Sequence, residues 1–137
     1  MVAMNAKERI KYIELHHTGA GWKPLIKELN EKIEALFPNY DIEQIKEKFG
    51  ALRYYISIPW NEDETEEEAR NRDVAYELTY EYEEKSMKIC ESCGATSNVT
   101  HGRHGDFWIK TLCDLCVMRN KKKITITASR KGNNNEI

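Results

Sequence analysis

Four cysteines in the C-terminal third of the chain have the residue type and spacing of a metal site. They form two Cys-x-x-Cys pairs, Cys90 with Cys93 and Cys113 with Cys116, and 19 residues lie between the pairs. Each short turn presents two thiolates to the same ion, so this pattern predicts one Zn²⁺ in a Cys₄ tetrahedron. A complete Cys₄ set leaves no open coordination position for water. The predicted role is therefore structural, in a zinc-ribbon or knuckle module.

A redox dithiol and another metal such as iron are the alternatives at this motif. The stretch Met1 to Glu14 is rich in charge and lacks the apolar run of a secretory signal, so we expect a cytoplasmic protein. In a reducing compartment, paired cysteines are better explained as metal ligands than as disulfides. A mean hydropathy of -0.72 and 32% charged residues argue against a membrane span. No small-molecule substrate is indicated.

A second group of reactive side chains, His101, His104 and Asp106, lies between the two cysteine pairs. Metal-dependent nucleases of the ββα type place a general-base histidine and a Mg²⁺ site between such pairs. Those nucleases usually have an acid before the histidine and an asparagine after the last cysteine, where this chain has Thr100 and Val117. A nuclease is therefore an alternative that ranks below the interpretation of both histidines as polar loop residues without a catalytic role.

The charge of the chain is unevenly distributed, which bears on nucleic-acid binding. The net charge of -2 divides into -7 for residues 1–86 and +5 for residues 87–137. Phosphate contacts need cations, and a flanking indole provides a stacking surface. The candidate contacts are Arg103, Trp108, Lys110, Arg119, Lys121, Lys122, Lys123, Arg130 and Lys131. The acidic part would repel phosphate unless it lies on the far side of the molecule.

Hydrophobic periodicity places two helices and a β-hairpin before the cysteines. Residues 5–17 predict a helix with Ala6, Ile10, Ile13 and His17 on one face, and residues 24–37 predict a stronger one. We expect these helices to form an antiparallel pair that covers the sheet. Residues 41–58 predict a hairpin that turns at Gly50, although its first half also fits a short helix.

An acidic run over residues 61–68 predicts a solvated loop that leads into a third helix ending near Lys85. Its predicted inward side chains are Val74, Ala75, Leu78 and Tyr82. Residues 121–128 predict a further strand, and residues 132–137 a disordered tail. The predicted organisation is a helix and hairpin domain over 1–86, a zinc-ribbon module over 87–131, and the tail.

The segment between the knuckles contains an apolar group that we expect to pack the module against the helical part. It consists of Phe107, Trp108, Ile109 and Leu112. For Trp108, a role as a core anchor is preferred over a role as an exposed recognition aromatic.

Several segments together resemble a family of small uncharacterised bacterial and phage zinc-ribbon proteins. They are Gly21-Trp22-Lys23-Pro24-Leu25, residues 44–55 (QIKEKFGALRYY), Cys90-x-x-Cys93-Gly94, and Trp108 to Cys113. In that family the last ligand is often histidine, where this chain has Cys116. The resemblance implies no activity. The phage association of the family implies inhibition of a host factor as one option. The resemblance also implies that a basic and aromatic surface could be functional, formed by Lys46, Lys48, Phe49, Arg53 and Tyr55. For Phe49 and Tyr55, packing in the core or turn is an equal alternative.

These features combine into an α+β protein with two N-terminal helices, a β-hairpin, a third helix and a C-terminal Cys₄ module. We interpret it as a non-enzymatic zinc protein that binds a macromolecule. A protein partner is favoured, through an exposed helix face or the side of the third helix that carries Tyr76, Tyr80 and Tyr82. Nucleic acid is the first alternative and the ββα nuclease the second.

Overall fold

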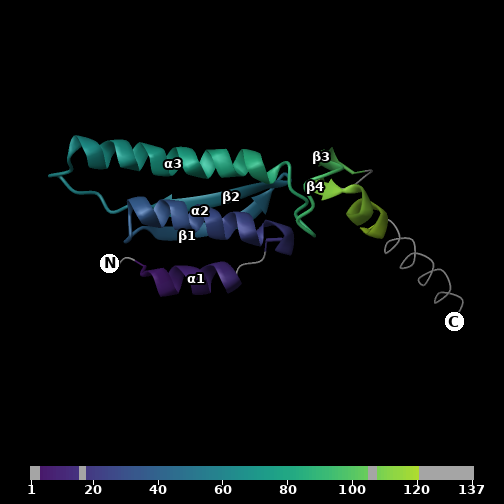
Figure 1. Cartoon of the computed structure of the whole chain (residues 1–137), viewed down its shortest axis with the longest axis horizontal. Helices are drawn as coiled ribbons and strands as arrows, with labels where there is room; N and C mark the ends of the chain where they lie inside the picture. Colours follow the sequence, from purple (N-terminus) through teal and green to yellow (C-terminus); the bar gives the residue numbers. More distant parts are fainter. Residues whose placement is uncertain (1–3, 16–17, 105–107, 121–137) are drawn as a thin grey trace, which may run out of the picture.

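The computed structural model describes residues 4–15, 18–104 and 108–120 and has the predicted α+β class (Figure 1). The elements follow the chain in the order α1 (Ala6–Leu15), η1 (Ala20–Trp22), α2 (Lys23–Leu36), β1 (Asp41–Lys48), β2 (Ala51–Ser57), α3 (Glu66–Ser86), β3 (Val99–Arg103) and β4 (Ile109–Cys113). Residues 114–120 are also helical. The strands form two separate antiparallel pairs, β1 with β2 and β3 with β4.

The first hairpin follows the predicted pattern along β2. Leu52, Tyr54 and Ile56 are buried on one face, while Tyr55 points to the other and is exposed. Lys48 pairs with Ala51, so Phe49 and Gly50 form a two-residue turn with φ angles of 54° and 74°. Two left-handed residues define the type I′ turn that matches strand twist. The hairpin prediction is confirmed, and the helical alternative for its first half is wrong.

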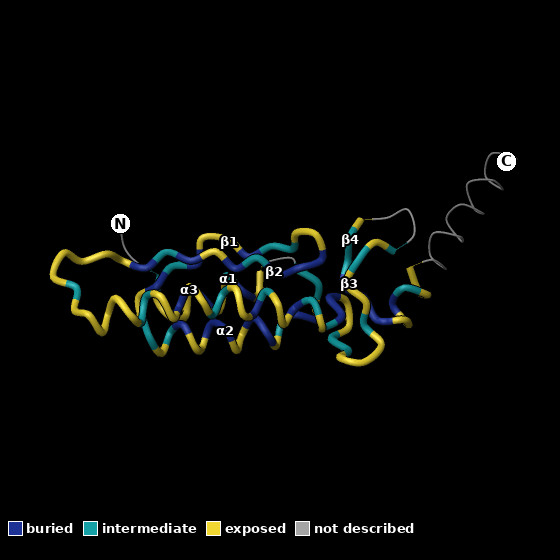
Figure 2. The backbone as a smooth tube through the Cα atoms, turned by 90° about the horizontal axis from the view of Figure 1, so that it is seen from above, coloured by how far each residue is buried: buried dark blue, intermediate teal, exposed yellow. Residues whose placement is uncertain are grey.

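The helices cover one face of this hairpin. In Figure 1, α1 and α2 run antiparallel, as predicted, and α3 lies along the β2 side. Figure 2 shows the hairpin as one layer and α2 on the opposite side of the buried zone. The main core lies between these layers and is formed by α1, α2, both strands and α3. The second hairpin lies beyond the Phe49–Gly50 turn, next to the C-terminal end of α3.

The long helix α3 begins at a capped, acidic end. The Thr65 hydroxyl accepts a hydrogen bond from the Glu68 amide at 3.1 Å, and Glu66, Glu67 and Glu68 occupy the first turn. Carboxylates there interact favourably with the helix dipole. Tyr82 is buried as predicted, but the prediction that Val74 faces inward is wrong, because 42% of Val74 is exposed.

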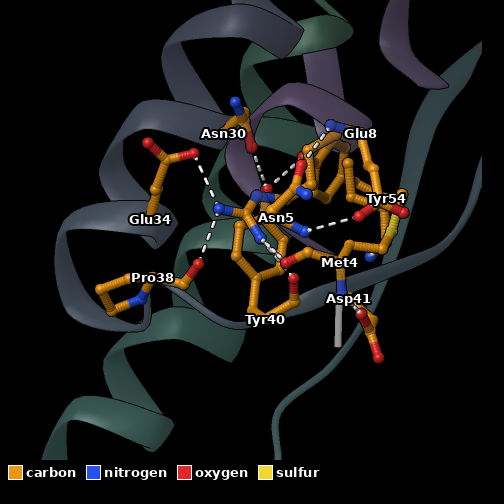
Figure 3. Close-up of polar contacts among 11 residues, drawn as sticks. Met4, Asn5, Glu8, Asn30, Glu34, Pro38, Tyr40, Asp41 and Tyr54 are labelled. Atoms are coloured by element: carbon orange, nitrogen blue, oxygen red, sulfur yellow. Dashed lines mark hydrogen bonds and ion pairs between the residues drawn. The ribbon is translucent and has the colours of Figure 1, made fainter. Parts of the chain in front are cut away.

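The face that α1 buries differs from the predicted one. Ile10 is 55% exposed, whereas Arg9 is completely buried beside Ile13. The Arg9 guanidinium donates to the carbonyls of Tyr40 at 2.8 Å and Pro38 at 2.8 Å, and it pairs with Glu34 at 3.0 Å (Figure 3). Hydropathy alone places an arginine outside, so only the acceptors offered by the loop after α2 explain its burial.

A hydrogen-bonded tyrosine pair lies beside this arginine in the core. The hydroxyls of Tyr40 and Tyr54 are 2.7 Å apart, and the Tyr40 hydroxyl donates to the side-chain oxygen of Asn30. Burial raises the pKa of both phenols above the ordinary value of 10. The core thus contains a polar network in which the side chains of Asn30, Tyr40 and Tyr54 are linked by hydrogen bonds.

Several predictions fall outside the described residues: the strand over 121–128, the tail over 132–137, and His17 on the first helix. No helix in the described ranges is long and apolar enough to cross a bilayer.

Candidate metal centre

The four cysteines come together at the base of the second hairpin: Cys90 and Cys93 lie in the turn before β3, Cys113 ends β4, and Cys116 lies in the helical segment after it. Their sulfur atoms all lie within 4.8 Å of one another, and those of Cys93 and Cys113 are 3.6 Å apart. Four sulfurs bound at about 2.3 Å to one zinc ion would stand about 3.8 Å apart in a tetrahedron. The donor set and its spacing therefore fit one metal ion, and Cys90, Cys93, Cys113 and Cys116 are the residues that would hold it.

The first knuckle has the backbone geometry that its glycine predicts. Gly94 has a φ of 85°, and its amide donates to the Cys90 carbonyl at 2.9 Å. The Cys90 amide in turn donates to the Ala95 carbonyl at 2.9 Å. A side chain at a positive φ is strained, so glycine lets the turn close.

The thiols have unequal acidities. Burial raises the pKa of Cys90, but backbone hydrogen bonds from Cys93, Cys113 and Ser92 outweigh it and hold the pKa at about 7. Burial and the neighbouring thiols of Cys113 and Cys90 raise the pKa of Cys116 to about 12. Four thiolates this close repel one another, so they ionise together only around a cation.

The core around the cysteines is small. Its buried members are Cys90, Cys113, Cys116 and Leu112, with Ala95, Val99 and Val117 packed partly against them. Three of the four buried side chains are thus thiols that converge on one point. An apolar core of this size is too small to order a domain by itself, which is the usual situation for a metal-stabilised unit.

The first knuckle docks against η1 with no space between the backbones. A Cβ on Gly21 would lie 2.0 Å from the Cys90 carbonyl oxygen, and one on Gly19 would lie 1.9 Å from the Glu91 carbonyl oxygen. The Gly21 amide donates to Glu91 O at 3.0 Å. The buried Trp22 indole donates to the carbonyls of Ser86 and Ile89 at 3.1 and 3.0 Å. Glycines are required at these two positions because the backbone of residues 19–21 touches the backbone of the first knuckle.

The second hairpin docks on the turn of the first. Thr111, which is fully buried, donates from its hydroxyl to the Gly50 carbonyl at 2.5 Å. The same oxygen lies 2.8 Å from His101 Nδ1, and it must accept there because its only proton is committed to Gly50. Glu91 continues the contact, since its carboxylate accepts from the Thr111 amide at 3.0 Å.

An ion-paired lysine closes this junction. Lys110 Nζ lies 2.7 Å from Glu47 and 3.4 Å from Glu91, so it links β1, the first knuckle and β4. Burial opposes the charged form, yet the two carboxylates raise the pKa of Lys110 above its ordinary value. Sequence reasoning missed Glu91, Thr111 and Gly21 as junction residues. The closely spaced glycines before Trp22 were the available signal.

The residues of the nuclease hypothesis form no site among the described residues. His104 Nε2 contacts the Thr100 carbonyl at 3.1 Å, His101 contacts Thr111, and Asp106 lies outside the described residues. Within the described ranges, the four cysteines are the one group of three or more metal-ligating side chains.

The prediction that Trp108 anchors the core is wrong, because its side chain is 79% exposed. Leu112 does pack inward, and Phe107 lies outside the described residues. Trp108, Lys110, Lys48 and Phe49 line one groove at the junction.

The other sequence-predicted binding residues are distributed over the hairpins. Arg53 pairs with Glu83 at 2.9 Å, and Tyr55 lies beside it in a groove against α3. Lys46 lies 5.7 Å from the centre of the Tyr55 ring. Arg103 is exposed at the end of β3. Lys121, Lys122, Lys123, Arg130 and Lys131 lie outside the described residues.

In comparisons with known proteins, no family model, no curated protein and no solved structure matches this chain. The cysteine cluster and the surfaces next to it are therefore the features that indicate function.

Proposed function

We propose that this chain is a non-enzymatic, zinc-stabilised protein that acts by binding another protein. The observation that supports the metal is the convergence of four thiols within 4.8 Å of one another. When bound, zinc would cross-link the two knuckles and order the small second core. A Cys₄ site has no position for a water molecule, so its contribution is folding rather than hydrolysis.

A groove rich in tyrosine supports the protein-binding role. Tyr55 from β2 lies with Tyr76 and Tyr80 from α3 around a cavity of about 190 Å³. These side chains are 42%, 38% and 66% exposed. Tyrosine combines a large apolar area with a polar tip and is enriched in interfaces. Tyr82 is completely buried, so it does not belong to this surface.

The charges near the tyrosines indicate the chemistry of the partner. Glu43, Glu77 and Glu81 are exposed on the strand and helix that frame the groove. The nearby Arg53 is neutralised by Glu83. A partner that presents basic and apolar side chains would complement this surface.

Metal analysis of the full chain, purified without chelator, tests the zinc assignment. We expect one zinc per chain, loss of the metal in Cys113→Ser and full retention in His104→Ala, whose ring contacts the Thr100 carbonyl of its own hairpin. Zinc-free protein, or a Cys113→Ser variant with unchanged stability, would refute the assignment.

Capture from a lysate of the source cells tests the protein-binding role. A Tyr76→Ala/Tyr80→Ala variant should lose the partner, whereas Trp60→Ala, which truncates an exposed aromatic outside the groove, should retain it. Equal capture by both variants would contradict the tyrosine surface.

A further inference from the structure

A second groove lies at the junction between the two hairpins. Glu47, Lys48 and Phe49 line it from the first hairpin, and Trp108, Ile109 and Lys110 line it from the second. Its volume is about 370 Å³. The Lys110–Glu47 ion pair at 2.7 Å and the bond from Thr111 to Gly50 hold the two walls together. The groove therefore exists only when the cysteine module is docked.

Two aromatic rings on opposite walls of this groove are largely exposed. Phe49 is 58% exposed and Trp108 is 79% exposed. Both are large apolar side chains that folding leaves in water, and both come from walls fixed by the junction contacts. Flat rings presented in this way are stacking surfaces for other flat rings.

The backbone at Phe49 is unfavourable for this residue type. Its φ of 54° lies in the left-handed region, and it occupies the first position of the two-residue turn. Asparagine, aspartate or glycine is preferred there, and a bulky residue costs about 1 kcal/mol. The turn would form more readily without this side chain. Strain of this kind is characteristic of binding sites.

The groove is also bordered by available positive charge. Among the described residues, Lys48 and Arg103 have no ion-pair partner, whereas Lys110 is neutralised by Glu47 and Glu91. Lys48 lies 5.7 Å from the Phe49 ring centre, and Arg103 pairs across β3–β4 with Ile109, which lines the groove. The acidic segment 61–68 lies at the opposite end of the molecule (Figure 1).

We propose that this groove binds single-stranded nucleic acid. Unpaired bases stack on Phe49 and Trp108, and the backbone phosphates contact Lys48 and Arg103. A duplex would not serve, because its bases are already stacked and present only their edges. This surface is separate from the tyrosine groove and adds a second ligand class to the proposed function.

Fluorescence anisotropy with a labelled 12-nucleotide oligo(dT) tests the proposal on the full zinc-loaded chain at 50 mM salt. Phe49→Asn and Trp108→Ala should each weaken binding about tenfold, the typical effect of losing one stacking contact. Trp60→Ala is the matched control, because Trp60 is 70% exposed and lies beyond the other end of β2. The affinity of this variant for the oligonucleotide should equal that of the wild type. Phe49→Asn should unfold at the same or a higher urea concentration than the wild type, since asparagine suits the turn.

Salt dependence tests the phosphate contacts. Binding should weaken steeply from 50 to 200 mM salt, and Lys48→Ala and Arg103→Ala should each reduce the log–log salt slope by about 1. No binding at 50 mM salt, or a preference for duplex, would overturn the proposal. Unchanged affinity of the Phe49→Asn/Trp108→Ala double variant would also overturn the proposal, because the lysines after residue 120, and not the groove, would then account for binding.

Discussion

Gly21→Ala should separate the first knuckle from the helical part of the protein. The added Cβ would lie 2.0 Å from Cys90 O, 2.5 Å from Gly94 N and 2.9 Å from Glu91 C. All three are backbone atoms, so no side-chain rotation relieves the overlap. Cys90 O is also held by the Gly94 amide at 2.9 Å, which prevents a local shift of the carbonyl.

The magnitude follows from the distance that the knuckle must move. Ordinary contact begins at 3.4 Å, so the backbones must separate by about 1.4 Å. That movement breaks the Gly21–Glu91 hydrogen bond, which is 3.0 Å long. Overpacking costs about 1–3 kcal/mol and a lost hydrogen bond about 1 kcal/mol, so we expect a loss of about 2–4 kcal/mol in the free energy of unfolding.

Urea unfolding followed by tryptophan fluorescence measures this loss, together with the rate of zinc release to a coloured chelator. Gly21→Ala should lower the unfolding midpoint and accelerate zinc release. Ala20→Ser is the matched control, because Ala20 is the adjacent residue and is exposed. If Gly21→Ala changes the unfolding free energy by less than about 0.5 kcal/mol, the value for a neutral surface site, the close approach of η1 to the knuckle is wrong.

Three further predictions concern the polar contacts. Thr111→Val removes both the donor to Gly50 and the acceptor for His101, so it should lower the free energy of unfolding in urea by about 1–2 kcal/mol. Thr111→Ser keeps the hydroxyl and should lose much less, so equal losses in the two variants would refute the hydroxyl's role. Arg9→Met leaves the buried Tyr40 carbonyl and the partly buried Pro38 carbonyl without their donor, so it should lower the unfolding free energy by about 2–4 kcal/mol. Lys7→Met on the exposed face of α1 should be neutral, and a small effect of Arg9→Met would contradict the buried network. The pKa values of Tyr40 and Tyr54 in the folded protein are raised above the ordinary value of 10. The stability that these neutral, buried phenols contribute is therefore complete below pH 10. As the pH rises above 10, the free energy of unfolding should fall by about 1.4 kcal/mol per pH unit for each phenol. Urea unfolding between pH 9 and 11 should therefore show a shallower decline for Tyr54→Phe than for the wild type, and identical slopes would refute the burial of this phenol.

Local patterns were sufficient for the first hairpin, the three long helices and the clustering of the four cysteines, but they did not predict β3 or the helical residues 114–120. The alternation along Leu52, Tyr54 and Ile56 repeats every two residues, and each Cys-x-x-Cys pair lies within a single turn, so neighbours in sequence carry the signal. The residues that packing selects were harder to predict. Ile10 and Arg9 exchanged their expected positions because the acceptors for Arg9 come from the loop after α2, which the pattern of α1 does not contain.

By itself, the sequence determined the α+β class, the turn at Gly50 and the identity of the four thiols, because each depends on chemistry within a few residues. Only the tertiary structure decided which surfaces exist. It placed Gly21 against Cys90, seated Thr111 on Gly50, and brought Phe49 and Trp108 to one groove from distant parts of the chain. Such pairings depend on how two hairpins dock, and a docking arrangement is determined by the shape and charge of both partners together.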